Sequence, residues 1–410
     1  MKSSRICIIL LSVTLSLFIS FPCIAASSDI LITKEGSQMD WADAHIDENL
    51  VAFHVSSSSP PAIKVYHANG TLYRNIPLTS EVMRLDSLEI SDGRVYFTEY
   101  DPSESSLLRN ETVWECNLLT MEKRVLYITP VVTRVQQKIT KIVADGNHIV
   151  LLKEGGGLNL ILHTISDDSD RIIFTSQSMI HGIAIDGDRI LWGCERTDKE
   201  PGREIHIYTI STGEDYVIPE SKSIRTWGYG DISGDRVVWE MAAHEPDASK
   251  GYPHLVNAGG DIRLTDLSTG KTRSVEILNT PSTPFISGDM VVYVKKPEIN
   301  YNNSDTGTIR VYDIGTGKLS DFASEVAAIS DFDNGLVVWH RLKPMSFWLT
   351  PVSGKIPSAV SPTTVTAETG TQKSTQQNPT PAESPVETVF IILAVTVGVT
   401  VYVVLKKKSR

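Results

Sequence analysis

The amino-acid sequence predicts an all-β chain that folds as a seven-bladed β-propeller and continues into one C-terminal transmembrane helix. Three observations lead to the propeller. A strand–turn–strand motif recurs seven times, a second motif follows it in the same units, and no amphipathic helical pattern separates the units. The composition, 41% hydrophobic and 21% charged over 410 residues, is that of a globular protein.

The first motif is a short apolar strand, a turn of Asp, Gly and Asn, and a second strand that is hydrophobic on both faces. It reads ISGDRVVW at 232–239 and recurs at 286–293, 185–192, 90–97 and 332–339, with weaker copies at 145–151 and 47–53. Successive copies end 41 to 54 residues apart, at Phe53, Phe97, Leu151, Trp192, Trp239, Tyr293 and Trp339. Seven copies at this period predict seven structural units.

The second motif is an alternating strand that ends in a Gly turn, after which a fourth, more polar strand begins. It occurs at 205–213, 262–270 and 309–317. Four strands per unit at this period are typical of a propeller blade. The last unit, 326–352, shows only three strands, whereas 29–33 is a strand without a blade. We therefore expect the N-terminal strand to complete the last blade and close the ring, which removes an exposed sheet edge.

The paired motifs, ISGDxVVW and IxVYDIxTGK, resemble the TolB-like, YVTN-type propeller repeats of surface proteins from methanogenic archaea. The resemblance covers 28–352 and is strongest in the fourth to sixth units. It implies a propeller fold and a cell-surface location. It implies no shared catalytic residues, because function on a common fold depends on the individual site.

The two ends of the chain predict export and membrane attachment. Residues 1–26 combine Lys2 and Arg5, an apolar run and a small-residue end, as a secretory signal peptide does; the alternative is an acylated lipoprotein at Cys23. Residues 353–388, rich in Thr, Ser and Pro, are predicted to form a stalk, and the uncharged run 389–405 is predicted to span the membrane. We then expect the basic tail 406–410 to stay in the cytoplasm and 28–352 to be extracellular.

Charge and cysteine content agree with an external domain. Without the signal peptide and the tail, the chain has 32 basic and 49 acidic residues, a net charge of −17, so nucleic acid is not an expected partner. Cys116 and Cys194 fall two units apart, so we expect two small buried residues and no disulfide. The predicted N-glycosylation positions lie in turn-like segments: Asn69, Asn110 and Asn302.

The candidate binding site is the central funnel on the face that carries the long, irregular loops, since rigid scaffolds usually place function on such loops. Residues at the start of the innermost strands should surround it: Trp41, Asp86, His181, Trp227, Tyr229 and Asp231. Aromatic groups beside a carboxylate suit a sugar or a peptide. The alternatives stay open that Trp227 and Tyr229 pack between blades and that His181 is an ordinary hydrogen-bonded histidine. Asp167, Asp168 and Asp170 are predicted to form a charged turn.

Three functions fit these features. The first is a non-enzymatic surface protein that binds a glycan, a peptide or a protein partner, or forms part of the cell coat. The second is an extracellular hydrolase or lyase with its site in the funnel, and the third is a quinone-dependent dehydrogenase. We expect no metal and no cofactor, because no loop has a recognisable ligand spacing. Two carboxylates, or a carboxylate and a His, close together at the axis would favour an enzyme.

Overall fold

The computed structural model describes most of the predicted propeller. The described residues are 29–33, 44–56, 58–79, 85, 87–101, 111–129, 137–195, 202–222, 226–242, 259–280, 282–296, 307–326, 328–342 and 345–352. The predicted signal peptide, stalk and cytoplasmic tail lie outside them. No helix within the described segments has the length and apolar character needed to cross a membrane, and the predicted span at 389–405 is not among those segments.

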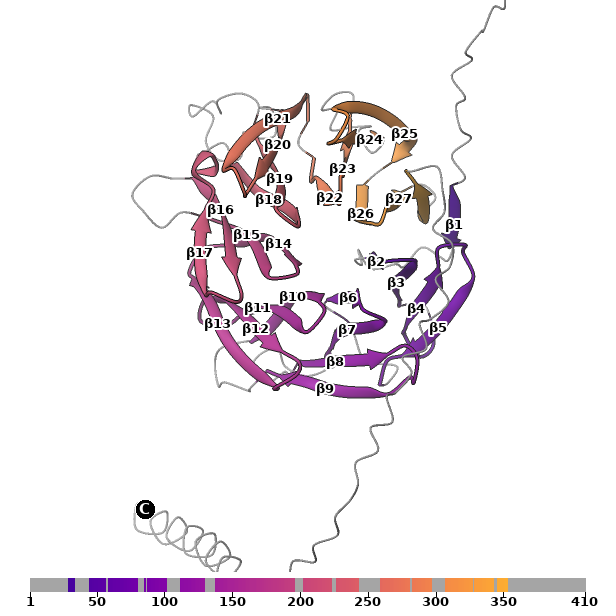
Figure 1. Ribbon diagram of the computed structural model, residues 1–410. Coiled ribbons are helices and arrows are strands. Elements are labelled where there is room, and N and C mark those ends of the chain that lie inside the picture. Colours follow the sequence, from indigo (N-terminus) through magenta and orange to yellow (C-terminus); the bar gives the residue numbers. More distant parts are fainter. Residues whose placement is uncertain are drawn as a thin grey trace, which may run out of the picture. The chain divides into compact units, whose positions relative to one another are not determined.

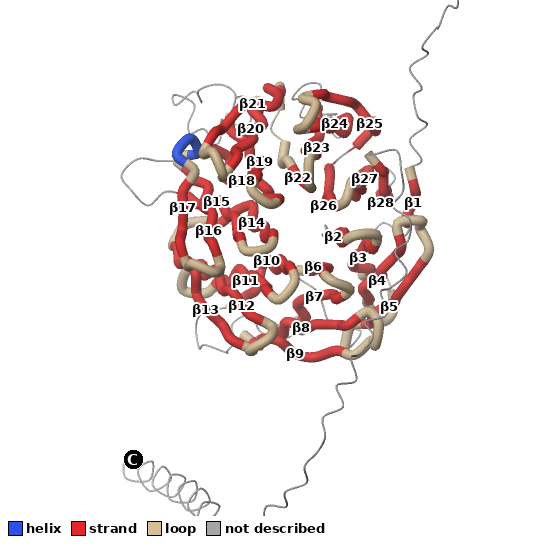
Figure 2. The backbone as a smooth tube through the Cα atoms, in the orientation of Figure 1, coloured by secondary structure: helices blue, strands red, loops and turns tan. Residues whose placement is uncertain are grey.

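The described strands form seven four-stranded antiparallel sheets. Figures 1 and 2 show these sheets arranged around a central axis. Blades 1 to 3 consist of β2 (Ala44–Asp47), β3 (Leu50–Val55), β4 (Ala62–His67), β5 (Leu72–Pro77), β6 (Leu88–Ser91), β7 (Arg94–Glu99), β8 (Thr112–Asn117), β9 (Lys123–Ile128), β10 (Lys138–Asp145), β11 (His148–Glu154), β12 (Leu158–Thr164) and β13 (Ser169–Ser176). Blades 4 and 5 consist of β14 (Ile180–Asp186), β15 (Arg189–Glu195), β16 (Arg203–Thr209), β17 (Glu214–Val217), β18 (Thr226–Ser233), β19 (Arg236–Met241), β20 (Gly260–Asp266) and β21 (Lys271–Leu278), with a 3-10 turn at Pro219–Ser221. Blades 6 and 7 consist of β22 (Phe285–Ser287), β23 (Met290–Lys295), β24 (Gly307–Asp313), β25 (Lys318–Val326), β26 (Ala328–Asp333), β27 (Leu336–Leu342), β28 (Met345–Pro351) and β1 (Ile30–Thr33). The predicted all-β, seven-bladed fold is confirmed.

The N-terminal strand closes the ring, as predicted. Strand β1 pairs antiparallel with β28, so that Ile30 lies opposite Leu349 and Leu31 opposite Trp348. The hydroxyl of Thr350 donates a 2.7 Å hydrogen bond to Asp29 Oδ1. The last blade therefore combines the first strand of the propeller with its final three, which pairs the edge of β28.

The core is divided among the interfaces between blades. The buried residues form seven apolar clusters, and each cluster joins the facing sheets of two neighbouring blades. The second strand of each blade lies in the middle of this arrangement, so its side chains are buried on both faces, as its sequence predicts. The aromatic residues that end the motif are almost fully buried, and Trp239 and Trp339 donate their indole N–H groups to Thr265 and Thr350 at 2.9 and 2.8 Å.

A ring of Asp and Ser residues links neighbouring blades near the axis. Each innermost strand ends at one of them: Asp47, Ser91, Asp145, Asp186, Ser233, Ser287 and Asp333. At six interfaces this side chain accepts a hydrogen bond from a backbone N–H in the first turn of the next blade. The distance is 2.8 Å from Glu48 N to Asp333 Oδ2, for example, and 3.1 Å from Gly288 N to Ser233 Oγ. The polar residue before the motif's turn is thus an inter-blade contact as well as a turn former.

We expect a moderate loss of stability when one of these inter-blade hydrogen bonds is removed. Ser287→Ala deletes the acceptor for the N–H of Asn334, at 3.1 Å, and the hydroxyl that donates to Asp333 Oδ1, at 3.2 Å, and should lower the free energy of unfolding by about 1 to 2 kcal/mol. Ser268→Ala is the control, because Ser268 is exposed and its hydroxyl donates to Asp266 Oδ1 within its own turn, at 2.6 Å. Urea unfolding of both variants measures the difference. Equal losses in the two variants would show that the ring does not couple the blades.

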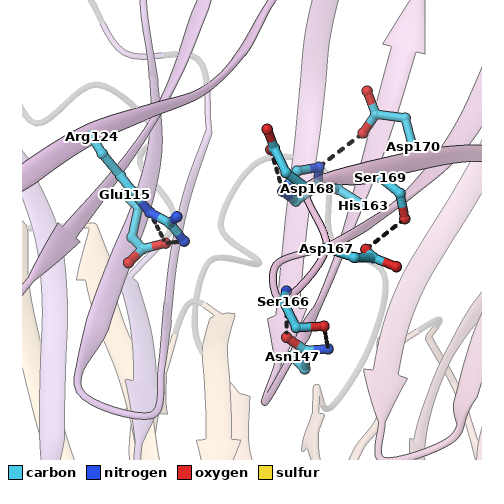
Figure 3. A network of polar contacts seen from close by, with 9 residues as sticks. All are labelled: Glu115, Arg124, Asn147, His163, Ser166, Asp167, Asp168, Ser169 and Asp170. Atoms are coloured by element: carbon cyan, nitrogen blue, oxygen red, sulfur yellow. Dashed lines mark hydrogen bonds and ion pairs between the residues drawn. The ribbon is translucent and has the colours of Figure 1, made fainter. Parts of the chain in front are cut away.

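The predicted charged turn connects β12 to β13 and is shown in Figure 3. Its side chains bond to one another and to the strands: His163 Nδ1 lies 2.9 Å from Asp170 Oδ1, and Ser169 donates to Asp167 Oδ1 at 2.7 Å. These carboxylates are largely exposed, so each ion pair contributes little to stability. The turn is structural, as the sequence indicates.

Cys116 and Cys194 are buried and neither forms a disulfide, which confirms the expectation for these two cysteines. Of the predicted glycosylation positions, Asn69 is exposed in the turn between β4 and β5, where its Oδ1 accepts a 2.6 Å hydrogen bond from the hydroxyl of Thr71. Asn110 and Asn302 lie outside the described residues.

Candidate functional site: the central funnel

The innermost strands of all seven blades enclose a cavity of about 830 Å³ on the axis of the ring. His181, Tyr229 and Asp231 line it, as predicted. The backbone of Trp227 lies on β18. Trp41 and Asp86 lie outside the described residues. Three of the six proposed residues therefore lie in the wall of the cavity.

His181 and Tyr229 face each other across the boundary between blades 4 and 5. Their rings lie 5.4 Å apart at an angle of 60°, and Tyr229 is 38% exposed. Burial lowers the pKa of His181, and the charge of Arg203 lowers it further, so the imidazole is neutral at neutral pH. The pair presents an aromatic and a neutral imidazole to the funnel, a surface suited to stacking or hydrogen bonding with a ligand.

This pair is positioned by an unusually close approach of two backbones. A Cβ atom added to Gly193 would lie 2.6 Å from Gly228 Cα, and one added to Gly182 would lie 2.8 Å from Tyr229 Cα. Strands β14 and β18 both change register at this point. Glycine is therefore required where β14 and β15 meet β18, and the contact fixes the wall that carries His181 and Tyr229.

Asp231 lines the cavity and also links blade 5 to blade 6. Its Oδ1 accepts the N–H of Ile232 at 2.9 Å, and its Oδ2 accepts the N–H of Ile286, in the next blade, at 2.8 Å. Asp331 repeats this arrangement, accepting from Phe332 and from Ile46 at 2.8 and 2.9 Å. Burial raises the pKa of Asp231 to about 7, although the two backbone hydrogen bonds oppose the shift.

A second group of residues in the funnel brings a histidine between two carboxylates. His45 Nδ1 lies 3.4 Å from Glu89 Oε2 and 3.5 Å from Asp331 Oδ2. Both His45 and Glu89 are buried, and burial raises the pKa of Glu89 to about 7 against the opposing charge of His45. The three side chains come from β2, β6 and β26, so three blades contribute to one cluster.

Sequence reasoning missed this cluster, although a signal was present. In every blade the residue two positions before the ring of Asp and Ser faces the funnel. It is apolar in three blades and polar in four: Val143, Ala184 and Phe285, against His45, Glu89, Asp231 and Asp331. Where one blade carries a polar residue at a position that is apolar in other blades, that residue indicates either a hydrogen bond between blades or a binding site.

The electrostatic character of the funnel is strongly acidic. Among the described residues that line it are eight carboxylates and one lysine, Lys141. Burial raises the pKa of Asp47 to about 7, and the charges of Asp333 and Asp92 contribute. Carboxylates crowded into a partly buried cavity repel one another, and a cation placed among them would relieve the repulsion.

The His45 cluster has the chemistry for two tasks. One ligand atom from each of His45, Glu89 and Asp331 lies within 4.8 Å of the others, which is a donor set for a divalent cation. The same arrangement, a histidine beside a carboxyl group with a pKa near neutrality, can exchange protons with a ligand.

Comparison with known proteins supports the fold. No protein-family model matches the chain, and no curated protein matches it. Among solved structures it is similar to the tricorn protease (TM-score 0.54, 10% identity, 80% of this chain), of whose length it covers about a third, 34%. It is also similar to an oligogalacturonate lyase in complex with manganese (TM-score 0.52, 12% identity, 74% of this chain and 86% of that one).

The propeller domain of the Trilobed protease from Pyrococcus furiosus is a further similar structure, at 13% identity, with a TM-score of 0.53 over 75% of this chain and 93% of that one. That domain is described as having an open velcro topology, whereas β1 closes the ring here. TolB from Acinetobacter baumannii also matches, but with a TM-score of 0.39. At such low identities the likeness concerns the fold alone: the chain is a seven-bladed β-propeller with an acidic central funnel.

Proposed function

We propose that this protein is a membrane-anchored, cell-surface propeller that binds a positively charged segment of a peptide or a neighbouring surface protein in its funnel. The observation that carries the proposal is the charge of the cavity, which has eight carboxylates and one lysine among its described lining residues. A lysine or arginine side chain entering this cavity would neutralise part of that charge.

The size and surface of the cavity agree with such a ligand. A volume of about 830 Å³ lies within the range of pockets that hold peptides and small molecules. Tyr229 offers a partly exposed ring to a cation, and Glu89 and Asp331 offer carboxylates. Since residues from the innermost strands of all seven blades line the cavity, several side chains can reach a ligand on the axis at once.

Binding of short peptides to the full chain tests the proposal. Peptides that differ only in a central Arg, Lys, Gln or Glu are compared by isothermal titration calorimetry. We expect the Arg and Lys peptides to bind at least about tenfold more tightly than the Gln peptide, and the Glu peptide not to bind. Glu89→Gln should weaken the binding of the Arg and Lys peptides. Glu214→Gln, at an exposed position on β17, should leave their binding unchanged. Equal affinity for all four peptides would overturn the proposal.

The proposal predicts a specific dependence on pH. The pKa values of Asp47, Glu89 and Asp231 are each raised to about 7, so these groups lose their protons, and gain attraction for a cation, as the pH rises through neutrality. Affinity for the Arg peptide should increase roughly tenfold between about pH 6 and about pH 8. Calorimetry at both values measures the change, and the rise should be smaller in Glu89→Gln. A constant affinity would contradict the assignment of these carboxyl groups.

The surface location rests on the sequence at the two ends of the chain. A signal-like segment at 1–26, a polar stalk and an apolar run before a basic tail support export and a single span. The resemblance of the repeats to TolB-like surface proteins supports the same location. Labelling of intact cells with a membrane-impermeant amine reagent should modify the propeller and leave a tag placed after residue 410 unmodified. The reverse pattern would overturn the topology.

A second candidate, a hydrolase or lyase, is favoured by one observation. His45 lies within 3.5 Å of two carboxylates in the funnel, and the pKa of Glu89 is raised to about 7, so the pair could act as acid and base. Mass spectrometry of peptides and oligosaccharides incubated with the full chain would detect cleavage. Activity lost in His45→Ala and retained in Glu214→Gln would favour the enzyme over the binding protein.

A further inference from the structure

A third cluster of chemically active side chains lies outside the funnel, on blade 4. Strands β15 and β16 pair so that Cys194 lies opposite Glu204 and Trp192 lies opposite His206. Side chains two residues apart on a strand share a face, so Cys194, Glu204 and His206 project to the same side of the sheet. Their sulfur, oxygen and nitrogen atoms lie within 4.8 Å of one another.

The imidazole of His206 is held in place from its other side. Its Nδ1 lies 2.9 and 3.0 Å from the two carboxylate oxygens of Asp215, on β17, and its Nε2 lies 3.2 Å from Glu204 Oε1. Trp192 stacks on the ring at 5.0 Å and 8°, and Phe174 of the neighbouring blade packs at 5.3 Å. A carboxylate on Nδ1 and ligand atoms around Nε2 are the usual environment of a metal-bound histidine.

We propose that Cys194, Glu204 and His206 form a binding site for a divalent cation of the zinc type. A thiolate, a carboxylate and a neutral imidazole are all ligands of Zn²⁺, and their combined charge of −2 balances it. The thiolate excludes Ca²⁺ and Mg²⁺, which take oxygen ligands. Three protein ligands leave a fourth position, and Glu204, whose side chain is 20% exposed, marks the side from which the cation enters.

The competing explanation is a histidine held as a cation between carboxylates. Burial lowers the pKa of His206, but hydrogen bonds to Asp215 and Cys194 outweigh it and raise the pKa to about 10. A metal ion would therefore replace protons on the imidazole and the thiol. The two explanations differ in whether the sulfur of Cys194 becomes a ligand, which can be observed directly.

Co²⁺, a spectroscopic substitute for Zn²⁺, provides the test. The full chain is freed of metal with a chelator and titrated with Co²⁺. We expect the near-ultraviolet charge-transfer absorption of a cobalt–thiolate bond, saturating at about one equivalent and removed by Zn²⁺. Cys194→Ser should abolish the band. Cys116→Ser is the matched control, because Cys116 is also buried and free, and should retain it. Asp215→Asn should weaken binding about 10- to 100-fold without removing the band.

The wild-type spectrum decides the question even where a variant fails to fold. Absence of a thiolate band at saturating Co²⁺, or a band that persists in Cys194→Ser, would overturn the proposal and leave the cluster as a histidine–carboxylate ion pair. Cobalt held only by the funnel carboxylates would give no thiolate band. The result is therefore independent of the proposed function.

Discussion

Removal of residues 29–33 should cost this propeller about 5 kcal/mol or more of its free energy of unfolding. The segment supplies the outermost strand of blade 7, and its loss would leave β28 as a free edge. Ile32, buried in the cluster between blades 7 and 1, alone accounts for a large part of the effect. Since this cluster joins the first and last blades, its loss weakens the closure of the whole ring.

Point variants distinguish the loss of ring closure by β1 from a general destabilising effect of shortening the chain. Ile32→Ala should lower the free energy of unfolding by roughly 2 to 4 kcal/mol, as large-to-small changes in cores do. Leu72→Ala is the control: Leu72 lies on β5, the outermost strand of blade 1, and is 52% exposed, so its loss should cost less than about 1 kcal/mol. Urea unfolding measures the stability of the deletion variant and of both point variants. Similar stabilities for Ile32→Ala and Leu72→Ala would show that β1 does not close the ring.

The architecture could be predicted because the same strand–turn–strand motif recurs along the sequence. Each blade needs a tight turn after its first strand and a second strand buried on both faces, and these requirements leave a similar strand–turn–strand motif seven times. The closure by residues 29–33 followed from counting strands, because one strand was missing at the end and one was left over at the beginning. The number of blades and the closure of the ring were both inferred from local sequence patterns and from the number of strands. A single sequence contains both kinds of information.

The candidate sites were harder to predict because they depend on departures from the repeat. His45, Glu89 and Asp331 meet only after the ring closes and brings blade 7 beside blade 1. Their separation along the chain gives no indication of contact. His181, Tyr229 and Asp231 could be predicted because they belong to inner strands that the motif itself identifies.

The contacts around Cys194 were also not predictable from the sequence, although these residues lie close together in the chain. Cys194 and Glu204 lie in the same strand pair, but the connection between β15 and β16 has no repeat to fix its length, so their register was not evident. Cys194 was correctly expected to be buried. Its neighbours, and therefore its possible chemistry, follow only from the pairing of the two strands.

Gly193→Ala should lower the free energy of unfolding by about 3 kcal/mol, although it adds a single methyl group. The new Cβ would lie 2.6 Å from Gly228 Cα, and backbone atoms of β18 cannot move aside as a flexible side chain would. The strain would push β18 away from β15 and displace Tyr229, which the same strand carries into the funnel. Affinity for the Arg peptide should therefore fall together with stability.

Gly315→Ala is the matched control for this prediction. Neither Gly193 nor Gly315 adopts a positive φ, and a Cβ on Gly315 would meet its nearest neighbour, Asp313 Oδ1, at an ordinary 3.5 Å. Its cost should be below about 0.5 kcal/mol, because surface changes away from special contacts are nearly neutral. Urea unfolding of both variants measures the difference. If Gly193→Ala is as stable as Gly315→Ala, blades 4 and 5 are not held at backbone contact, and the wall that positions His181 and Tyr229 can adjust to its ligand.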